Sequence, residues 1–217
     1  MSSLQCLKRI HLEINRKDLI HYSKSTEAAF ALGHEVGNLA IQLYGGLNIE
    51  ANGGTYIEYN GGNFARALAQ TEQLMTSMFR APIFEATLQH GGVLVRQDVL
   101  LPDDNSWRIV EVKAATRVKP EHVHDCAVQA WVHLGSGWPL SQISLAHINN
   151  QFIYQGDGNY DGLLLENDLT GQVFDLLPTV PIWVERAREA AEGPMPDVAV
   201  GRHCTSPYEC PFLGFCW

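Results

Sequence analysis

The segment from Val93 to Lys113 constrains the fold more than any other part of the chain. Two runs of apolar and β-branched residues, VLVRQDVLL and WRIVEVK, flank the turn-forming cluster PDDNS, and this pattern predicts a β-hairpin. With the turn centred on Asp104-Asn105, Asp98 on the first strand lies directly opposite Glu111 on the second, and both side chains share one face. The hairpin therefore places two carboxylates side by side in an otherwise apolar setting.

Two facing carboxylates repel each other unless a cation lies between them. Oxygen ligands of this kind suit Mg²⁺ or Mn²⁺, and the backbone carbonyl of Val112 lies between the two acids and offers a further oxygen. Lys113 shares the acidic face, whereas Val110 and Val112 point the other way. In the competing interpretation this is a surface hairpin with scattered charges, in which Lys113 simply pairs with Glu111 or Glu85.

Length and composition favour one globular core. A chain of 217 residues can bury one substantial core with a small appended subdomain. The net charge of −9 counts against a sequence-independent nucleic-acid coat protein, but it leaves room for an enzyme with a local basic channel. No apolar stretch approaches the roughly 20 residues that span a bilayer, and the N-terminus has no signal-peptide core. We therefore expect a soluble, cytoplasmic protein that has no membrane partner.

Hydrophobic periodicity and turn signals predict an α/β fold with a mixed central sheet flanked by helices. A helix over 25–44 is capped by Ser25 or Thr26 and ended by Gly45-Gly46. A second helix over 63–79 starts at Asn63. The remaining expected elements are a short helix or arm over 4–20, a strand over 83–89, the hairpin, a helix over 119–134, a strand pattern over 141–154, a helix ending near Glu192 and a linker over 193–201.

Two helices carry polar residues with candidate roles. His34 falls in the middle of the 25–44 helix, where a lone histidine is more often structural than functional. Asp125, Gln129 and His133 follow the spacing i, i+4, i+8 in the 119–134 helix, so they form one polar stripe. Cys126, in the same helix, has the setting of an ordinary buried thiol.

The other cysteines gather at the two ends of the chain. Cys204, Cys210 and Cys216 fall within the last fourteen residues, and Cys6 lies near the other terminus. A disulfide framework does not suit a cytoplasmic chain of this size, and the spacing is wider than that of a CxxC zinc knuckle. Four thiolates suit either an iron–sulfur cluster or zinc.

Together these motifs resemble the PD-(D/E)xK nucleases. Asp98 followed by Glu111-Val112-Lys113 is similar to the D-(x)n-E-x-K core of that group, and His34 and Gln129 are similar to the added motifs of its RecB-like branch. The terminal cysteines resemble the iron–sulfur staple of AddB and of the CRISPR-adaptation exonucleases. The chain also resembles, over nearly its whole length, a bacterial family of unknown function whose N-terminal half is this type of nuclease. The segments that carry this resemblance are TEQLMTSMFRAPIFEATL, WRIVEVKAATRVK, HDCAVQAWV and CTSPYECPFLGFC.

The resemblance implies a restriction-endonuclease-like fold that forms a single RecB-like nuclease domain over 1–217. Its nuclease core would cover 21–192, and residues 1–20 with 193–217 would form an iron–sulfur subdomain that joins the termini. Four thiolates would hold a [4Fe–4S] cluster, with zinc as the less favoured occupant. Those ligands would be Cys6, Cys204, Cys210 and Cys216.

The resemblance also implies a role for each residue of the hairpin site. His34, Asp98, Glu111 and the Val112 carbonyl would bind Mg²⁺ or Mn²⁺, which activates a water and neutralises the scissile phosphate. Lys113 would orient the water or stabilise charge on the phosphate, and Gln129 would position Lys113, a water or the DNA backbone. Glu85 would be an outer carboxylate.

The chain departs from the RecB-like pattern at two positions. His133 stands where a tyrosine usually follows the glutamine by four residues, which puts DNA handling rather than metal binding in question. Gln97 stands in place of the nominal proline.

The expected function is a metal-dependent DNA nuclease in repair or defence, acting as an exonuclease on single-stranded DNA with free ends. A basic groove for the strand would draw on Lys8, Arg9, Arg117 and Lys119, with Trp131 either as a stacking platform or as core. Two alternatives stay open: a catalytically silent DNA-end-binding or scaffold module with a structural cluster, and a redox or sensing protein in which the cluster is the working part. The terminal aromatic residues would pack around the cysteines or contact a following domain or complex partner; they are Phe212, Phe215 and Trp217.

Overall fold

The computed structural model describes residues 2–45, 54–59, 61 and 64–217. The chain divides into two compact units, a sheet unit of Leu32–Leu177 and a terminal unit that combines Met1–Ala31 with Pro178–Trp217. These boundaries differ from the predicted core of 21–192, because the long helix near the C-terminus groups with the terminal segments and not with the sheet.

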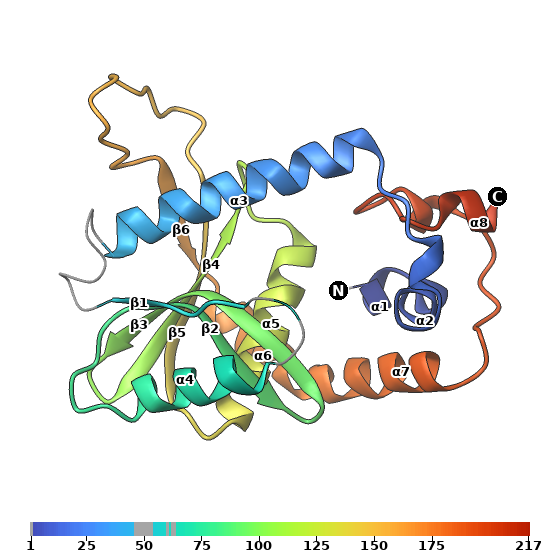
Figure 1. Ribbon diagram of the computed structural model, residues 1–217, viewed down its shortest axis with the longest axis horizontal. Coiled ribbons are helices and arrows are strands. Elements are labelled where there is room, and N and C mark those ends of the chain that lie inside the picture. The colour runs from blue at the N-terminus through green and yellow to red at the C-terminus, as the bar shows by residue number, and fades with distance from the viewer. Residues whose placement is uncertain (1, 46–53, 60, 62–63) are drawn as a thin grey trace. The chain divides into compact units, whose positions relative to one another are not determined.

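The sheet unit is built on one mixed six-stranded sheet, in which the strands follow chain order from β1 to β6 (Figure 1). The β2–β3, β3–β4 and β5–β6 pairs are antiparallel, whereas β1–β2 and β4–β5 are parallel. This confirms the α/β fold with a mixed sheet. The strands are β1 (Thr55–Tyr56), β2 (Ile83–His90), β3 (Val93–Asp103), β4 (Ser106–Lys113), β5 (Leu140–Ile148) and β6 (Leu164–Asp168).

The predicted hairpin is confirmed with its register. Val99 pairs with Val110, and the ladder runs to Asp103 opposite Ser106, so the turn is centred on Asp104-Asn105 as expected. Asp104 takes a left-handed φ of 45°, a conformation that aspartate tolerates better than most residues. Because a one-residue slip would exchange the two faces of the strand, this register fixes which side chains meet across the hairpin.

Each face of the sheet is covered by a helix. Val36 and Ala40 of α3 (Lys24–Gly45) pack against one face, in a core formed with Phe84, Val99, Val110, Val112 and Ala146. The opposite face meets α5 (Pro120–Gly135), which packs against β2, β3 and β5, and Pro120 occupies the first turn of this helix as predicted. Val110 and Val112 thus point away from the acidic face, in agreement with the alternation of the strand.

Several elements differ from the sequence predictions at their ends. The hydroxyl of Ser23, not of Ser25 or Thr26, accepts the backbone N–H of Thr26 at 3.3 Å, and α3 begins at Lys24, one residue earlier than expected. The pattern over 141–154 forms a strand only as far as Ile148, and β6 pairs back onto it. The predicted ends at Gly46 and Asn63 lie outside the described residues. The other helices of the sheet unit are α4 (Ala65–Met75) and α6 (Thr170–Leu176), which a 3₁₀ turn (Leu177–Thr179) follows.

The terminal unit joins the two ends of the chain. Leu12, Cys210 and Phe212 form its small core, and Phe212 is fully buried, whereas Phe215 and Trp217 are 44% and 79% exposed. Only the first of the three aromatic residues therefore packs beside the cysteines as expected. The unit contains α1 (Ser2–Gln5), α2 (Leu7–Asn15), α7 (Val180–Glu192), α8 (Leu213–Cys216) and 3₁₀ turns at Lys17–Leu19 and Arg202–Cys204. No helix among the described residues is long and apolar enough to cross a bilayer.

Packing of α5 against the end of β2 can be tested with two helical glycines. A methyl group at Gly135 would lie 2.2 Å from the His90 ring, and that ring is held by an edge-to-face contact with Trp131. Gly135→Ala should therefore lower the free energy of unfolding by about 1–3 kcal/mol. Gly37 in α3 has no atom within 4 Å of such a methyl group, so Gly37→Ala should raise it by about 1 kcal/mol. Urea denaturation measures both, and equal effects would contradict this packing.

Candidate functional site

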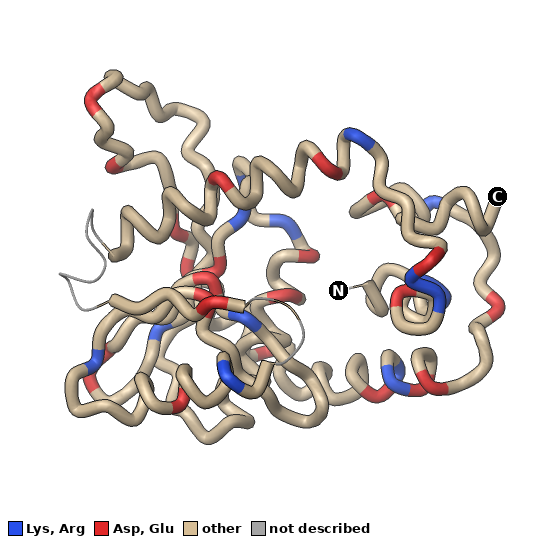
Figure 2. Tube along the Cα trace, in the orientation of Figure 1, with Lys and Arg blue, Asp and Glu red and all other residues tan. Residues whose placement is uncertain are grey.

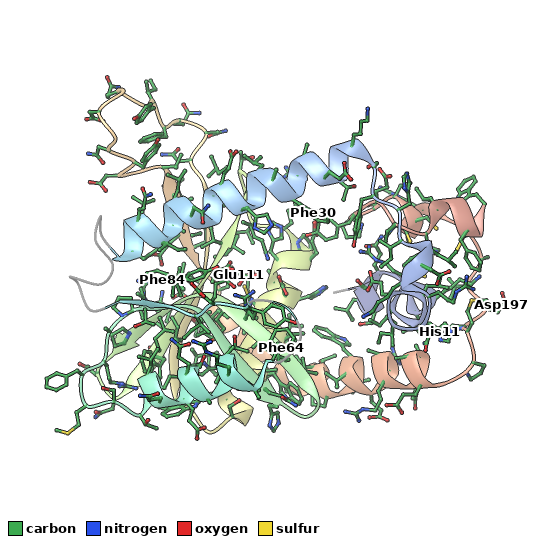
Figure 3. The ribbon with its side chains drawn as sticks, in the orientation of Figure 1. His11, Phe30, Phe64, Phe84, Glu111 and Asp197 are labelled. Atoms are coloured by element: carbon green, nitrogen blue, oxygen red, sulfur yellow. The ribbon has the colours of Figure 1, made fainter. Side chains whose placement is uncertain are left out.

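Three acidic residues lie in a row across neighbouring strands of the sheet. Phe84–Val99 and Ala86–Gln97 are the flanking pairs of β2 and β3, which places Glu85 opposite Asp98. The β3–β4 register continues the row to Glu111, whose side chain is labelled in Figure 3. Figure 2 marks the charged positions along these strands. Glu85, Asp98 and Glu111 thus concentrate negative charge within a largely apolar sheet.

Glu111 is the most buried of these acids, at 3% exposure. Lys113 donates to its Oε1 at 2.5 Å, and the side-chain amide of Gln129 donates to its Oε2. Both carboxylate oxygens therefore have a partner, one from the same strand and one from α5. The structure thus brings Glu111, Lys113 and Gln129 together, and the Lys113–Glu111 pair is the contact that the competing interpretation of the hairpin also expected.

Asp98 stands just beyond the last ladder pair of the hairpin. Its Oδ2 accepts the backbone N–H of Val112 at 2.7 Å, so the aspartate side chain replaces the strand-to-strand bond at this point. The N–H and C=O of one strand residue point to the same edge, so the Val112 carbonyl also faces the Asp98 side. This is the oxygen that the sequence suggested as an additional ligand.

Lys113 is shared between two acids. Its ammonium lies 2.5 Å from Glu111 and 2.8 Å from Asp125. Burial disfavours the charged ammonium, but Glu111, Asp125 and Asp98 outweigh that effect, and the pKa of Lys113 is raised well above its ordinary value. The lysine therefore stays protonated across the physiological range.

One lysine does not neutralise all of the acids around it. Burial raises the pKa of Glu111, and the nearby Asp98 charge raises it further, against the opposing effect of Lys113. Burial likewise raises the pKa of Asp98, while Lys113 and the Val112 N–H lower it. The two carboxylates therefore resist carrying their charges together, as expected for facing acids in a desolvated place.

The described residues include a set of donors suited to a hard divalent cation. The Oε1 of Gln129, in a side chain only 5% exposed, is buried without a hydrogen-bond partner, and its amide nitrogen contacts Glu111. An unpaired buried oxygen beside the Glu111 carboxylate fits Mg²⁺ or Mn²⁺. As placed, however, no three His, Cys, Asp or Glu side chains of the described residues converge closely enough to hold a metal ion.

His34 is exposed on α3 and is not joined to the acidic pair. It is close enough to Glu85 to lower the pKa of that carboxyl, but no described contact links it to Asp98 or Glu111. The structure therefore brings together Asp98, Glu111, Val112, Lys113 and Gln129, and leaves His34 at the edge of the group.

The two departures from the RecB-like pattern contact each other. Gln97 and His133 lie 3.3 Å apart between side-chain polar atoms, and both are fully buried. Burial lowers the pKa of His133 to about 4, so the ring is neutral at physiological pH. Because Gln97 precedes Asp98 and His133 lies one turn beyond Gln129, this bond ties β3 to α5 beside the candidate site.

The sequence analysis underestimated Asp125 and did not identify Arg96 as a residue near the site. Asp125 was assigned only to a polar stripe, yet it shares Lys113 with Glu111; the i, i+4 spacing from Gln129 is the signal that could have found it. Arg96, two residues before Asp98, forms an ion pair with Glu85 at 3.1 Å. Alternation along β3 places it on the Asp98 side.

In the terminal unit the four predicted cysteine ligands line one cavity, together with Leu12, Phe212 and other residues. Burial raises the pKa of Cys210, and the nearby Cys6 and Cys204 raise it further, while the Phe212 N–H and Arg9 oppose this. These thiols are therefore neighbours, although their side chains as placed do not converge on a common point. A metal-cluster subdomain thus remains a prediction.

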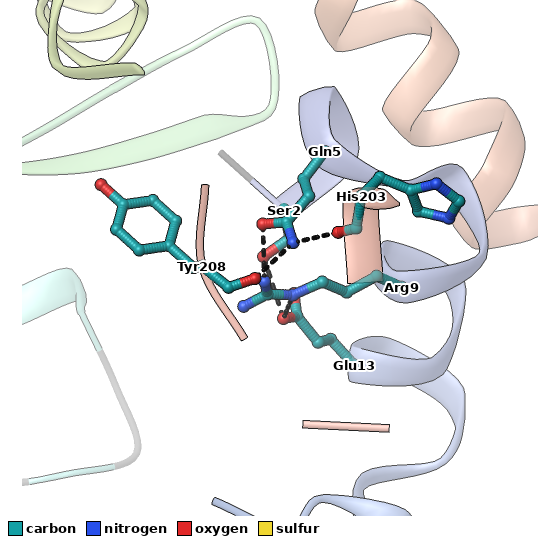
Figure 4. Close-up of polar contacts among 6 residues, drawn as sticks. All are labelled: Ser2, Gln5, Arg9, Glu13, His203 and Tyr208. Atoms are coloured by element: carbon teal, nitrogen blue, oxygen red, sulfur yellow. Dashed lines mark hydrogen bonds and ion pairs between the residues drawn. The ribbon is translucent and has the colours of Figure 1, made fainter. Parts of the chain in front are cut away.

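Hydrogen bonds beside the cysteines join the N-terminal segment to the C-terminal segment (Figure 4). The Gln5 amide donates at 2.6 Å to the backbone carbonyls of both His203 and Tyr208, and Arg9 is bonded to Gln5 and to Glu13. Gln5 precedes Cys6, and His203 precedes Cys204. The polar contacts thus hold the two cysteine-bearing segments side by side.

The residues proposed for a basic groove have mixed surroundings. Arg9 forms an ion pair with Glu13 at 2.8 Å, and Lys8 donates to the Val198 carbonyl. Arg117 is exposed, whereas Lys119 and Trp131 are half-buried. Trp131 meets His90 edge-to-face, so the packing role suggested for it agrees with its surroundings better than the role of an open stacking platform.

Comparison with known proteins identifies no family. No family profile and no curated protein matches the sequence. Among the solved structures that match, one described as "Crystal structure of SSO0001" has 13% identity and a TM-score of 0.41, over 85% of this chain and 73% of that chain. A similarity of this strength carries no argument about function.

Because the pKa of Glu111 is raised in the folded protein, the free energy of unfolding should fall as pH rises. In the unfolded chain the Glu111 carboxyl ionises near its ordinary pKa of 4.5, whereas in the folded protein it ionises only at a higher pH. The free energy of unfolding therefore falls as pH rises from the unfolded pKa to the folded pKa, and it stays lower at higher pH. In chelator, wild type should lose stability between about pH 5 and about pH 8 relative to Glu111→Gln. Urea midpoints measure this, with exposed Glu189→Gln as control; parallel profiles for Glu111→Gln and wild type would contradict it.

Proposed function

We propose that the chain is a metal-dependent deoxyribonuclease that hydrolyses phosphodiester bonds, with single-stranded DNA ends as the favoured substrate. The observation that carries the proposal is the buried acidic group on β3 and β4, in which burial raises the pKa of both Asp98 and Glu111 despite Lys113, and the Asp98 charge raises that of Glu111 further. Together with the D-(x)n-E-x-K spacing, this excess of negative charge favours a divalent cation, the usual partner of a phosphodiester in hydrolysis.

Each residue of the group has a role that follows from its contacts. Asp98, Glu111, the Val112 carbonyl and the free Gln129 oxygen would hold Mg²⁺ or Mn²⁺, with His34 as a further candidate. The cation supplies Lewis-acid stabilisation of the phosphate and lowers the pKa of a water. Lys113 is held by Glu111 and Asp125, so its protonated ammonium is positioned to stabilise negative charge that develops on the phosphate.

Cleavage of end-labelled single-stranded DNA with Mn²⁺ or Mg²⁺ tests this function. Wild type should degrade the strand, and EDTA should stop it. Lys113→Ala should lower the rate at least about a hundredfold, because the group that stabilises the developing charge is lost. Glu111→Gln should lower the rate to a similar extent, because it removes a carboxylate ligand of the metal.

Two exposed substitutions serve as matched controls for this assay, Lys17→Ala and Glu189→Gln, and both should leave the rate unchanged. Circular dichroism confirms that each variant is folded. Full activity in folded Lys113→Ala would exclude the proposed site.

A second candidate function is a catalytically silent module that binds DNA ends or serves as a scaffold. It is favoured by the ion pairs of Lys113, which give Glu111 and Asp125 a partner without any metal. DNA-end binding that is unchanged by EDTA, with no product formed in Mn²⁺, would select this alternative over the nuclease.

For the terminal unit we propose a [4Fe–4S] cluster bound by Cys6, Cys204, Cys210 and Cys216. Its support is the common cavity that all four line and the hydrogen bonds that join the two segments. The exposed Trp217 and Phe215 offer an apolar surface to a following domain or complex partner.

Metal analysis of protein purified without oxygen tests the cysteine proposal. Iron and acid-labile sulfide should be present in equal amounts, because a [4Fe–4S] cluster contains as many sulfides as irons. Cys210→Ser should lose both, whereas Cys126→Ala, which alters a buried thiol of α5, should retain them. Zinc without sulfide would replace the cluster by a Cys₄ zinc site.

A further inference from the structure

Glu85 has a backbone conformation that its neighbours do not share. Its φ is +58°, in the left-handed region, where a non-glycine residue in a strand is strained. Phe84 and Ala86 on either side are fully buried and keep the β2–β3 register. The strand therefore continues through Glu85 with one residue turned, and the ladder has no pair between Glu85 and Asp98.

The ion pair of Glu85 does not account for this strain. Its carboxylate lies 3.1 Å from the Arg96 guanidinium, and both side chains are 28% exposed. Long side chains on adjacent strands form such pairs from ordinary extended backbone, and a partly exposed pair contributes little to stability. The position holds a glutamate, although glycine is the residue that takes a left-handed φ without cost.

The electrostatic surroundings of Glu85 include both the hairpin acids and His34. Across the register it is opposite Asp98, and it raises the pKa of that acid. After burial and Arg96, the nearby Glu111 and His34 are what affect the pKa of Glu85 itself. The carboxylate is thus within electrostatic reach of both hairpin acids and of the histidine on α3.

We propose that Glu85 is a further ligand for the divalent cation of this site, and that its left-handed backbone keeps the carboxylate beside Asp98. The inference rests on the proposed metal-dependent function and deepens it. A bound cation would then draw ligands from three strands together, since these side chains as placed do not converge on a common point. The unpaired buried oxygen of Gln129, which contacts Glu111, is the independent sign that this acidic group accommodates a cation.

Calorimetric titration of the full-length protein with Mn²⁺ tests the proposal without relying on activity. Glu85→Gln keeps the size of the side chain and should weaken Mn²⁺ binding at least about tenfold, which is about 1.4 kcal/mol. Glu72→Gln, an exposed change on α4, should leave the affinity unchanged. Equal affinities for Glu85→Gln and wild type would overturn the assignment.

A second variant separates metal binding from structure. Glu85→Gly should also bind Mn²⁺ at least about tenfold more weakly, yet its melting temperature in chelator should equal or exceed that of wild type, because glycine adopts the left-handed φ freely. A lower melting temperature with unchanged Mn²⁺ affinity would assign Glu85 a structural role and overturn the proposal.

Glu111→Gln distinguishes failure of this inference from failure of the proposed function. If Mn²⁺ binding to wild type is weakened by Glu111→Gln and not by Glu85→Gln, the metal site stands and the role of Glu85 is wrong. If wild type binds no Mn²⁺, or Glu111→Gln leaves the affinity unchanged, both proposals are wrong.

Discussion

The burial of more carboxylate than cationic charge on the central strands is the constraint on which the site depends. Glu111 is nearly inaccessible, Asp98 neighbours it, and Glu85 and Asp125 add charge to the same group, whereas Lys113 is the cation in contact with two of them. Charges removed from water are costly unless they are compensated. A surface hairpin would relax by turning such acids outward, but the register that buries Val110 and Val112 under α3 fixes Glu111 on the α5 side, where Gln129 contacts it.

The surrounding fold holds the group in place through polar contacts as well as packing. Gln129 reaches Glu111 from α5, and the buried Gln97–His133 bond joins the same helix to β3 beside Asp98. Buried polar contacts of this kind position neighbouring residues more sharply than apolar packing does, because each unsatisfied group carries a desolvation cost. The Gln129–Glu111 and Gln97–His133 contacts therefore link α5 to both strands of the hairpin.

The elements with a strong local signal could be predicted from the sequence. The PDDNS turn and the alternation around it determine the hairpin register, and Pro120 determines the start of α5. The stripe of Asp125, Gln129 and His133 follows from helical spacing, and the structure turns it toward β3 and β4. Other features depend on tertiary contacts that no local pattern reports: the return of β6 along β5, the left-handed Glu85, and the place of His34. The Ser23 cap is a local bond to Thr26, and the sequence left open which of the neighbouring hydroxyls would make it. The sharing of Lys113 between Glu111 and Asp125 also needs two elements that meet only after folding.

The central claim is that the acids of β3 and β4 bind a divalent cation. Anomalous diffraction from a crystal of the protein soaked in Mn²⁺ tests it most directly, since it locates the ion independently of activity. The account predicts an anomalous peak between Asp98 and Glu111, within ligand distance of at least one oxygen of each. Manganese bound elsewhere, with Lys113 still bridging Glu111 and Asp125 and no peak at the acids, would contradict it.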